Sequence, residues 1–561
     1  MAVRLLPLLL LLQGASLLQA PPAVLQPAPA HHGMTGADPR AAAAPGPPRP
    51  QAQPAAASDG AAETPAARRA LLRAAAGAPP FSYSMWLRTT HPRVMDEEEG
   101  AAAGPTPVRR SSVQQPLDHL DADNAARWTQ AYWRNAEHYK EGGPAFVMLS
   151  GTADYASDWL RRGHMADLAR AFGADSYFLT TRFFDRVDHP TPDVSVESLA
   201  YLSVEQVLQD VASFIEQLDL HNTHRQVVLF GAGFGGAVAT WARMRFPDLV
   251  SGVVASGATL EARYDTFSYF PVVSDTIDWY HRKDMDCLGY VRKAYLQLDA
   301  ALSTAAGRAY FNKYFQPCEP LAVNQTMSEE DRAQVLGLVA GVLADQVQDD
   351  QDGPLANGRP GNDKLWPYCF ALSSASDAPL VELARLVLFS VDGQCLDASF
   401  QGLVSALSTS DWVSEANTRG VRPWLWLQCT ELGQLPTTSG DLFKFPYSPS
   451  ISMSTFYKKL CNTIFGSDVS SQLIDNISQI NTVYGGKAPK ISNAIFVRGD
   501  LDPWKHLSPE EGLPGEEVHV FSVLRASHAH DMFPRDDYDP PWMKRTRKAV
   551  ANVLARWLSS S

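Results

Sequence analysis

The chain has 561 residues, of which 45% are hydrophobic, and its 48 basic and 61 acidic residues give a formal net charge of −13. This length and hydrophobic content allow a large globular core and more than one domain. The acidic balance, without a basic stripe, argues against a nucleic-acid partner and is best explained by solubility.

The first 20 residues have the pattern of a secretory signal peptide. Arg4 supplies a positive charge, Leu5 to Leu12 form a short apolar run, and Ala15 and Ala20 are small residues near a cleavage point. This run is too short to cross a bilayer, and no later segment is both long and uncharged. We therefore expect no membrane contact and a mature protein of the secretory route, either secreted or in endosomes or lysosomes.

Residues 21–112 are predicted to be a disordered leader or propeptide. They are dominated by Pro and Ala with few aromatic residues, so they cannot bury enough apolar surface to offset the entropy lost on ordering. Folded sequence is expected from residue 113.

Apolar runs then alternate with helical patterns. Residues 145–149, 176–179, 226–230 and 252–255 predict buried strands, whereas 158–171 and 203–218 predict helices. Residues 260–420 are mostly helical in pattern, and the alternation returns with strands at 493–497 and 518–521 and a helix at 544–558. The predicted class is α/β with a parallel sheet, formed by core segments 113–259 and 421–561 around a helical lid insertion at 260–420.

The predicted strand at 226–230 leads into a glycine-rich turn, Gly231-Ala232-Gly233-Phe234-Gly235-Gly236, and a helix-forming stretch. Strand, sharp turn and helix form the nucleophile elbow of an α/β-hydrolase, G-x-S-x-G, in which the serine attacks the substrate. Here Gly233 takes the place of that serine and has no oxygen to attack with. Neither Thr240, along the helix, nor Ser256, at the end of the next strand, is expected to replace it. The backbone N–H of Phe234 is the predicted oxyanion donor.

An acid and a histidine follow the last two predicted strands, in the chain order of α/β-hydrolase triads. Asp502 comes after 493–497 and His528 after 518–521. We expect Asp502 to orient the imidazole and His528 to act as general base. Two alternatives are open: Asp502 before Pro503 could simply start a turn, and His528, His530 and Asp531 could hold a metal. Because no further ligand motif is visible, we expect no metal and no cofactor.

The cysteines and sequons fit an oxidising compartment. Six cysteines are widely spaced without a CxxC pair, which argues against zinc, but the spacing does not determine their pairing. Asn324 and Asn476 each begin an Asn-x-Ser/Thr sequon and are candidate glycosylation sites.

In these motifs the chain resembles the lysosomal Pro-X carboxypeptidase and dipeptidyl peptidase II family of serine peptidases, most closely its thymus-specific serine protease branch. The shared stretches run from about residue 113 to 561 and include Pro116-Leu117-Asp118-His119, Gly142-Gly143-Pro144, Arg182-Phe183-Phe184, Pro190-Thr191-Pro192-Asp193, Leu202-Ser203-Val204-Glu205-Gln206, Cys429-Thr430-Glu431, Tyr484-Gly485-Gly486 and Gly499-Asp500-Leu501-Asp502-Pro503-Trp504. The resemblance implies an α/β-hydrolase core with a helical, disulfide-bearing lid and exopeptidase cleavage next to proline. It also implies the disulfides Cys287–Cys369, Cys318–Cys395 and Cys429–Cys461.

The chain departs from this family at its active site. The family's elbow is Gly-Gly-Ser-Tyr-Gly-Gly, its Gly-Gly-Glu-Gly segment is replaced here by Ser150-Gly151-Thr152-Ala153, and its Glu-His-Arg segment by Thr180-Thr181-Arg182. The elbow therefore loses its nucleophile, and each of the other two segments loses a carboxylate. Several changes around one site favour a peptidase-like protein that has lost catalysis but keeps a pocket for peptides, proline-containing ones among them.

Two other functions stay open. The chain is an active serine exopeptidase if Gly233 is an error or a variant of serine. Alternatively, it is an interaction protein whose working surface is the helical insertion. The sequence leaves the oligomeric state open, a homodimer included.

Overall fold

The structure is a computed structural model that describes residues 108–152, 156–224, 226–279, 286–348, 365–374, 378–390, 395–440, 444–446, 448–535 and 539–559. The predicted signal peptide, at 1–20, and the predicted leader up to residue 107 lie outside these residues.

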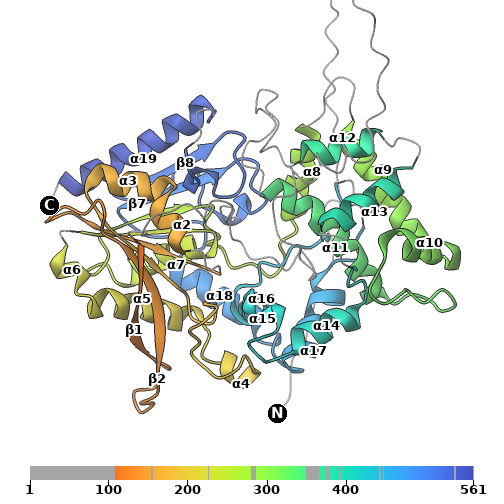
Figure 1. The fold of residues 1–561 in the computed structure, drawn as a ribbon, viewed down its shortest axis with the longest axis horizontal. Helices are drawn as coiled ribbons and strands as arrows, with labels where there is room; N and C mark the ends of the chain where they lie inside the picture. The colour runs from red at the N-terminus through yellow and green to blue at the C-terminus, as the bar shows by residue number, and fades with distance from the viewer. Residues whose placement is uncertain are drawn as a thin grey trace, which may run out of the picture. The chain divides into compact units, whose positions relative to one another are not determined.

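An eight-stranded sheet with strand order β1-β2-β4-β3-β5-β6-β7-β8 organises the fold (Figure 1). Antiparallel pairing joins β1 to β2 and β2 to β4, and the other neighbours are parallel. The carboxyl ends of the parallel strands meet at one edge, where open α/β sheets bind ligands. The strands are β1 (Val108–Pro116), β2 (Arg127–Asn135), β3 (Ala145–Leu149), β4 (Asp175–Leu179), β5 (Val227–Ala232), β6 (Gly252–Ser256), β7 (Ala494–Gly499) and β8 (Val518–Val523).

Helices cover both faces of the sheet, so its central strands are apolar throughout. All five residues of β3 are buried, as expected for a parallel strand with a helical layer on each side. Val147 and Leu149 pack in one apolar cluster with α5 (Val204–Gln217) and α7 (Phe234–Arg245). Phe146 and Met148 pack in another with α2 (Ala156–Arg161), α3 (His164–Phe172) and α19 (Pro541–Ser559). The short helices α4 (Val196–Leu199) and α6 (Leu220–Thr223) lie in the connections.

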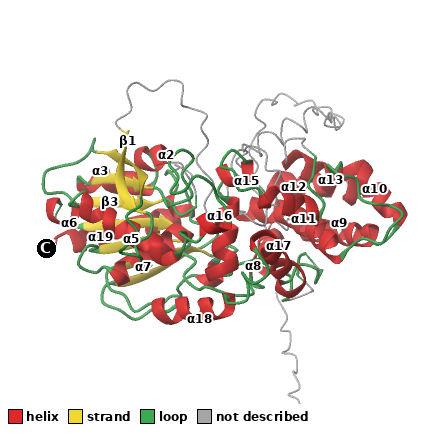
Figure 2. Ribbon diagram, turned by 90° about the horizontal axis from the view of Figure 1, so that it is seen from below, coloured by secondary structure: helices red, strands yellow, loops and turns green. Residues whose placement is uncertain are grey.

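A group of helices after β6 has an apolar core of its own. Figure 2 shows the strands in one part of the molecule and a region of helices alone beside it. This second core also takes in Trp504 and Leu507, from the segment after β7. Its helices are α8 (Tyr269–Trp279), α9 (Cys287–Leu302), α10 (Ala305–Phe315), α11 (Glu329–Gln348), α12 (Trp366–Ser374) and α13 (Pro379–Ser390).

The helices that follow belong instead to the core of the sheet. Leu403, Trp424 and Leu460 lie in the same apolar cluster as Val147 and Leu149. The elements are α14 (Phe400–Ser408), α15 (Glu415–Thr418), α16 (Val421–Leu427), the π-helices η3 (Gln428–Leu432) and η4 (Met453–Tyr457), α17 (Lys458–Phe465) and α18 (Leu473–Tyr484), and two 3₁₀ turns, η5 (Lys505–Leu507) and η6 (His530–Met532), follow later in the chain.

Three predicted boundaries differ from the structure. The sheet begins at Val108 rather than at residue 113, and β1 and β2 were not predicted. Neither strand is a continuous apolar run: β1 is exposed at five of its nine residues, and β2 buries the polar Gln130 and Asn135. The predicted helix at 158–171 is two helices, α2 and α3, separated at Gly163. Helices continue past residue 420 to Tyr484, and the next strand starts at Ala494. The sequence did not predict these later helices, because loops with Gly433 and Pro446 interrupt the helical pattern of 421–484.

The six cysteines form three disulfides, Cys287–Cys369, Cys318–Cys395 and Cys429–Cys461. This is the pairing that the family resemblance implies. The first joins α9 to α12, the second joins the segment after α10 to the segment after α13, and the third joins η3 to α17. No helix within the described ranges has both the length and the apolar character needed to cross a membrane.

Candidate active site

Gly233 forms a sharp turn between the end of β5 and the start of α7. Its backbone has φ 54° and ψ −123°, a conformation that glycine adopts freely and that costs about 1–3 kcal/mol with a side chain. Its N–H donates to the carbonyl of Ser256 at the end of β6, at 3.0 Å. The backbone therefore has the elbow shape that the sequence predicts, with no side chain at its tip.

The loop after β3 lies directly against the start of α7. A Cβ atom on Gly235 would be 2.6 Å from the carbonyl oxygen of Leu149 and 3.1 Å from the nitrogen of Gly151, so only glycine fits at this position. Phe234 is the first residue of α7, where backbone N–H groups point out of the helix end. The start of α7 and the backbone of Gly151 are therefore in close contact beside the elbow.

Asp502 and His528 form a buried pair in the loops after β7 and β8. His528 Nδ1 lies 2.8 Å from Asp502 Oδ2. A carboxylate only accepts hydrogen bonds, so Nδ1 carries the proton. The other oxygen, Oδ1, accepts from the backbone N–H of Trp504 at 2.8 Å. Both Asp502 and His528 are fully buried, and the arrangement matches the acid and base of a hydrolase triad.

Gly257, the residue after β6, allows this pair to approach the sheet. Its φ is +53°, and a Cβ atom there would lie 2.9 Å from His528 Nδ1 and 3.1 Å from Asp502 Oδ2. Because Gly257 directly follows Ser256, whose carbonyl binds the Gly233 N–H, the pair and the elbow meet at the same edge of the sheet.

Neither nearby hydroxyl is placed to replace the missing nucleophile. Thr240 Oγ1 donates to the carbonyl of Gly236 at 2.8 Å within α7. Ser256 Oγ donates to the carboxyl group of Asp531. Both side chains are fully buried, so each hydroxyl serves the interior of the protein.

The segments 150–152 and 180–181 carry hydroxyl side chains. Thr181 N–H donates to Ser150 Oγ at 2.9 Å, and the hydroxyls of these two residues are 3.1 Å apart. Thr180 Oγ1 donates to the carbonyl of Ala131 at 2.8 Å. Thr152 is buried, and its hydroxyl has no partner among the described residues. We call the segments 150–152 and 180–182 the rim of the site. The rim therefore offers no carboxylate at positions 150, 152, 180 or 181.

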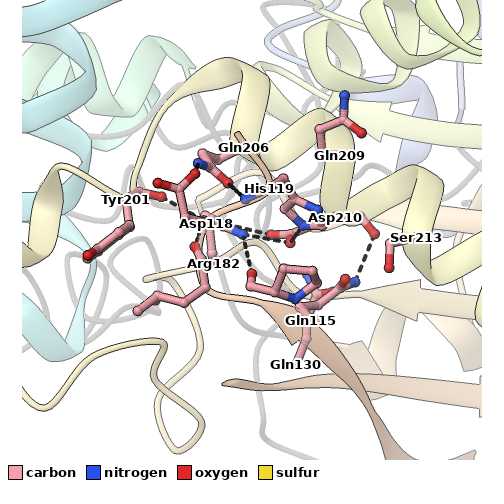
Figure 3. Close-up of polar contacts among 12 residues, drawn as sticks. Gln115, Asp118, His119, Gln130, Arg182, Tyr201, Gln206, Gln209, Asp210 and Ser213 are labelled. Atoms are coloured by element: carbon pink, nitrogen blue, oxygen red, sulfur yellow. Dashed lines mark hydrogen bonds and ion pairs between the residues drawn. The ribbon is translucent and has the colours of Figure 1, made fainter. Parts of the chain in front are cut away.

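Arg182 anchors this rim to the strands and helix beside it (Figure 3). Its guanidinium binds both oxygens of Asp210, at 2.7 and 2.8 Å, and donates to the carbonyls of Leu117 and Tyr201. His119 Nε2 lies 2.8 Å from Asp210 Oδ1. Arg182 is fully buried and its donors are used internally, so this network has a structural role.

A second buried cluster lies next to the His528 loop. Burial and the nearby Arg547 lower the pKa of His530 to about 3, and burial, Arg547 and Arg535 do the same for His164. Burial raises the pKa of Asp531, although hydrogen bonding from Ser256 opposes this. His528 contacts Asp502, whereas Asp531 accepts from Ser256. The described residues contain no group of three His, Cys, Asp or Glu side chains arranged to hold a metal ion.

The two sequons differ in accessibility. Asn324 is exposed in a bend between α10 and α11. Asn476 lies within α18, and its side-chain amide donates to the carbonyl of Thr430 at 2.8 Å. The Asn324 side chain is thus open to a glycosyl group in the folded protein, whereas the Asn476 side chain is half-buried and its amide is already hydrogen-bonded.

Sequence reasoning missed two residues that contact the Asp502–His528 pair. Gly257 had a signal, a glycine directly after a buried strand, which often marks a close approach. Gln348, whose carbonyl oxygen accepts from the His528 N–H at 3.3 Å, had none, because it lies 180 residues before that histidine in the chain.

Comparison with known proteins gives the chain a family context. Residues 115–550 match the family model described as "Serine carboxypeptidase S28". The chain is 30% identical over 468 residues to thymus-specific serine protease of Mus musculus, covering 82% of this chain and 89% of that protein. It is 28% identical to the Homo sapiens protein of the same name, over 82% and 88% of the two chains. It is 23% identical to the "Probable extracellular serine carboxypeptidase" of Arthroderma benhamiae, over 70% of this chain and 58% of that protein.

Solved structures give more distant matches. Epoxide hydrolase VrEH1 from Vigna radiata has 11% sequence identity and a TM-score of 0.32, covering 81% of this chain and 98% of that one. VinJ has 12% identity and a TM-score of 0.34, covering 80% and 98%.

Proposed function

The chain belongs to the serine carboxypeptidase S28 family, and we propose that it is a member that has lost catalysis and retains a pocket for peptides. The observation that carries the proposal is Gly233 at the tip of the elbow, with φ 54° and ψ −123°. Acyl transfer by this family's chemistry needs a side-chain oxygen there, because the acyl group is carried on it. Glycine cannot form that bond.

The preserved surroundings support a retained binding role. The Asp502–His528 pair keeps a 2.8 Å contact and full burial, and the loop after β3 still lies against the start of α7. Peptides are the ligands that membership of a peptidase family suggests, and proline-containing peptides follow from the resemblance. Loss of the carboxylates at positions 152 and 180 argues against the aminopeptidase-like recognition of a substrate amino terminus.

A secretory location is part of the proposal. Three disulfides are typical of proteins that fold in an oxidising compartment. The relative from Arthroderma benhamiae is named as extracellular. We infer that this chain follows the secretory route to the outside of the cell or to endosomes or lysosomes.

The decisive test uses a fluorophosphonate probe, which reacts with an activated serine. We expect no labelling of the purified wild-type protein and labelling of Gly233→Ser, with Gly233→Ala as the matched control that adds a Cβ without a hydroxyl. Both variants should also lose about 1–3 kcal/mol of stability, because a side chain at φ 54° is strained. Labelling of the wild type at a serine would refute the loss of catalysis.

The active-enzyme alternative has its own quick check. If the genomic codon at position 233 encodes serine, the protein is a serine exopeptidase with Asp502 and His528 as orienting acid and base. Peptide binding is measured separately, by calorimetry with a panel of X-Pro peptides on the wild-type chain. Binding that persists when the space beside Gly233 is blocked would favour the helical insertion as the binding surface.

A further inference from the structure

Gln348 brings the helical insertion into contact with the candidate catalytic pair. It is the last residue of α11, whose residues from Ala333 onward are all buried. Its side-chain oxygen Oε1 accepts from the indole Nε1–H of Trp504 at 2.8 Å and from the hydroxyl of Tyr269 at 3.4 Å. Its backbone carbonyl accepts from the His528 N–H at 3.3 Å.

These contacts close a ring of four hydrogen bonds. The Gln348 side chain binds the Trp504 indole, and the Trp504 backbone N–H binds Asp502 Oδ1. Asp502 Oδ2 binds His528 Nδ1, and the His528 backbone N–H returns to the carbonyl of Gln348. The ring joins three segments that are distant in the chain: the end of α11, the loop after β7 and the loop after β8.

The members of the ring are buried, which makes their hydrogen bonds depend on one another. Gln348 is 4% exposed, Trp504 2%, Asp502 0% and His528 1%. A buried N–H or C=O that loses its partner is costly, because no water replaces it. The phenol group of Tyr269, in α8, packs against the indole of Trp504 with centroids 4.8 Å apart. Packing from the insertion therefore also holds the indole in place.

We propose that Gln348 is a positioning residue: its amide fixes Trp504, and through Trp504 the Asp502 carboxylate, so that the Asp502–His528 pair takes its geometry only while the end of α11 is docked. The insertion is then part of the device that orients the pair, and not only a cover over it. This inference does not depend on whether the site binds peptides or turns them over.

The test uses the full-length protein with Gln348→Met, which keeps the side-chain length but removes the acceptor for Trp504 and Tyr269. Gln348→Glu restores an acceptor oxygen. Gln334→Met is the matched control, because Gln334 is also a buried glutamine of α11 but donates to the carbonyl of Asp397, away from the pair. Two quantities are measured: the far-downfield proton NMR signal of His528 Nδ1–H, and hydrogen exchange of peptides covering residues 523–533.

In Gln348→Met we expect the downfield signal to shift or disappear and exchange in 523–533 to become about tenfold faster. Gln348→Glu should recover both, and Gln334→Met should change neither, even if it lowers the melting temperature as much. An unchanged signal and unchanged exchange in Gln348→Met would overturn the proposal, and so would equal changes in Gln334→Met. If Gln348→Met does not accumulate as folded protein, the same two measurements are made on Trp504→Phe, which removes the indole donor from the same contact. The proposal then stands or fails on that variant.

Discussion

His164 allows a sharp test of how burial controls stability in this protein. It is the first residue of α3 and is 1% exposed. Neither of its ring nitrogens has a hydrogen-bond partner among the described residues. Burial, followed by the positive charges of Arg547 and Arg535, lowers its pKa from 6.5 to about 3. The folded protein therefore keeps this histidine neutral over a pH range in which the unfolded chain protonates it.

The sign and size of the effect follow from proton linkage. Below pH 6.5 the unfolded state binds a proton at His164 that the folded state does not, so stability falls as pH falls from 6.5 towards 3. Each pH unit in that window costs about 1.4 kcal/mol. Between pH 7 and pH 5 this histidine alone should therefore lower the free energy of unfolding by about 2 kcal/mol.

The variant His164→Leu removes the proton-binding group while keeping a side chain of similar volume. We expect its stability at pH 7 to stay within about 1 kcal/mol of wild type, because leucine fills the buried site with a side chain of similar volume. At pH 5 it should exceed the wild type by about 2 kcal/mol more than it does at pH 7. Urea unfolding at the two pH values, with matching m-values, measures this difference directly.

The comparison between variant and wild type isolates the histidine. Other groups titrate in the same range, but their contributions are common to both proteins and cancel. Met165→Leu, a buried substitution at the next position of α3, controls for changes in packing without changing a titrating group. If the wild type and His164→Leu lose the same free energy between pH 7 and pH 5, or if Met165→Leu behaves like His164→Leu, the reasoning from burial is wrong.

Three further predictions concern other sites. Gly257→Ala should displace the imidazole of His528, because the new Cβ would lie 2.9 Å from it at a φ of +53°, and loss of the downfield Nδ1–H signal at retained overall fold would show this. Burial raises the pKa of Glu431, whose carboxyl group accepts from the backbone N–H of Val204 at the start of α5, to about 7. The stability that the protonated carboxyl group contributes is present below pH 4.5 and is lost as pH rises to about 7. Glu431→Gln should therefore make the free energy of unfolding, measured with urea, depend less on pH between pH 4.5 and pH 7. Asn324→Gln should reduce the mass of the protein secreted from eukaryotic cells by one glycan, whereas Asn476→Gln should leave its glycan mass unchanged. A glycan found on Asn476 would contradict the hydrogen bond that its amide makes to the carbonyl of Thr430.

The parallel strands of the sheet were predictable because their signal is local. β3, β5 and β6 are continuous apolar runs, and burial on both faces requires this composition. β1 carries no such signal, since an edge strand with five exposed residues can be polar. The antiparallel pairing of β1 with β2 is therefore visible only in the folded chain.

The Asp502–His528 pair was predictable from its order along the chain, since both residues follow strands that end at the same edge of the sheet. Its supports were not. Gln348 lies in the insertion, far from both residues in sequence, and a glutamine at the end of a buried helix has no pattern that identifies its partners. The buried state of His164 was equally unpredictable, because histidine is intermediate in burial and no sequence pattern tells which histidines are enclosed.

The shared packing of Trp504 and Leu507 with the helices of the insertion has a consequence for protein engineering. A chimera that replaces residues 269–398 with the corresponding segment of a relative would change the helices that pack against Trp504 and Leu507. It would keep the native loop that carries Asp502. Such a graft should transplant residues 503–507 together with the helices, because the two surfaces were shaped against each other.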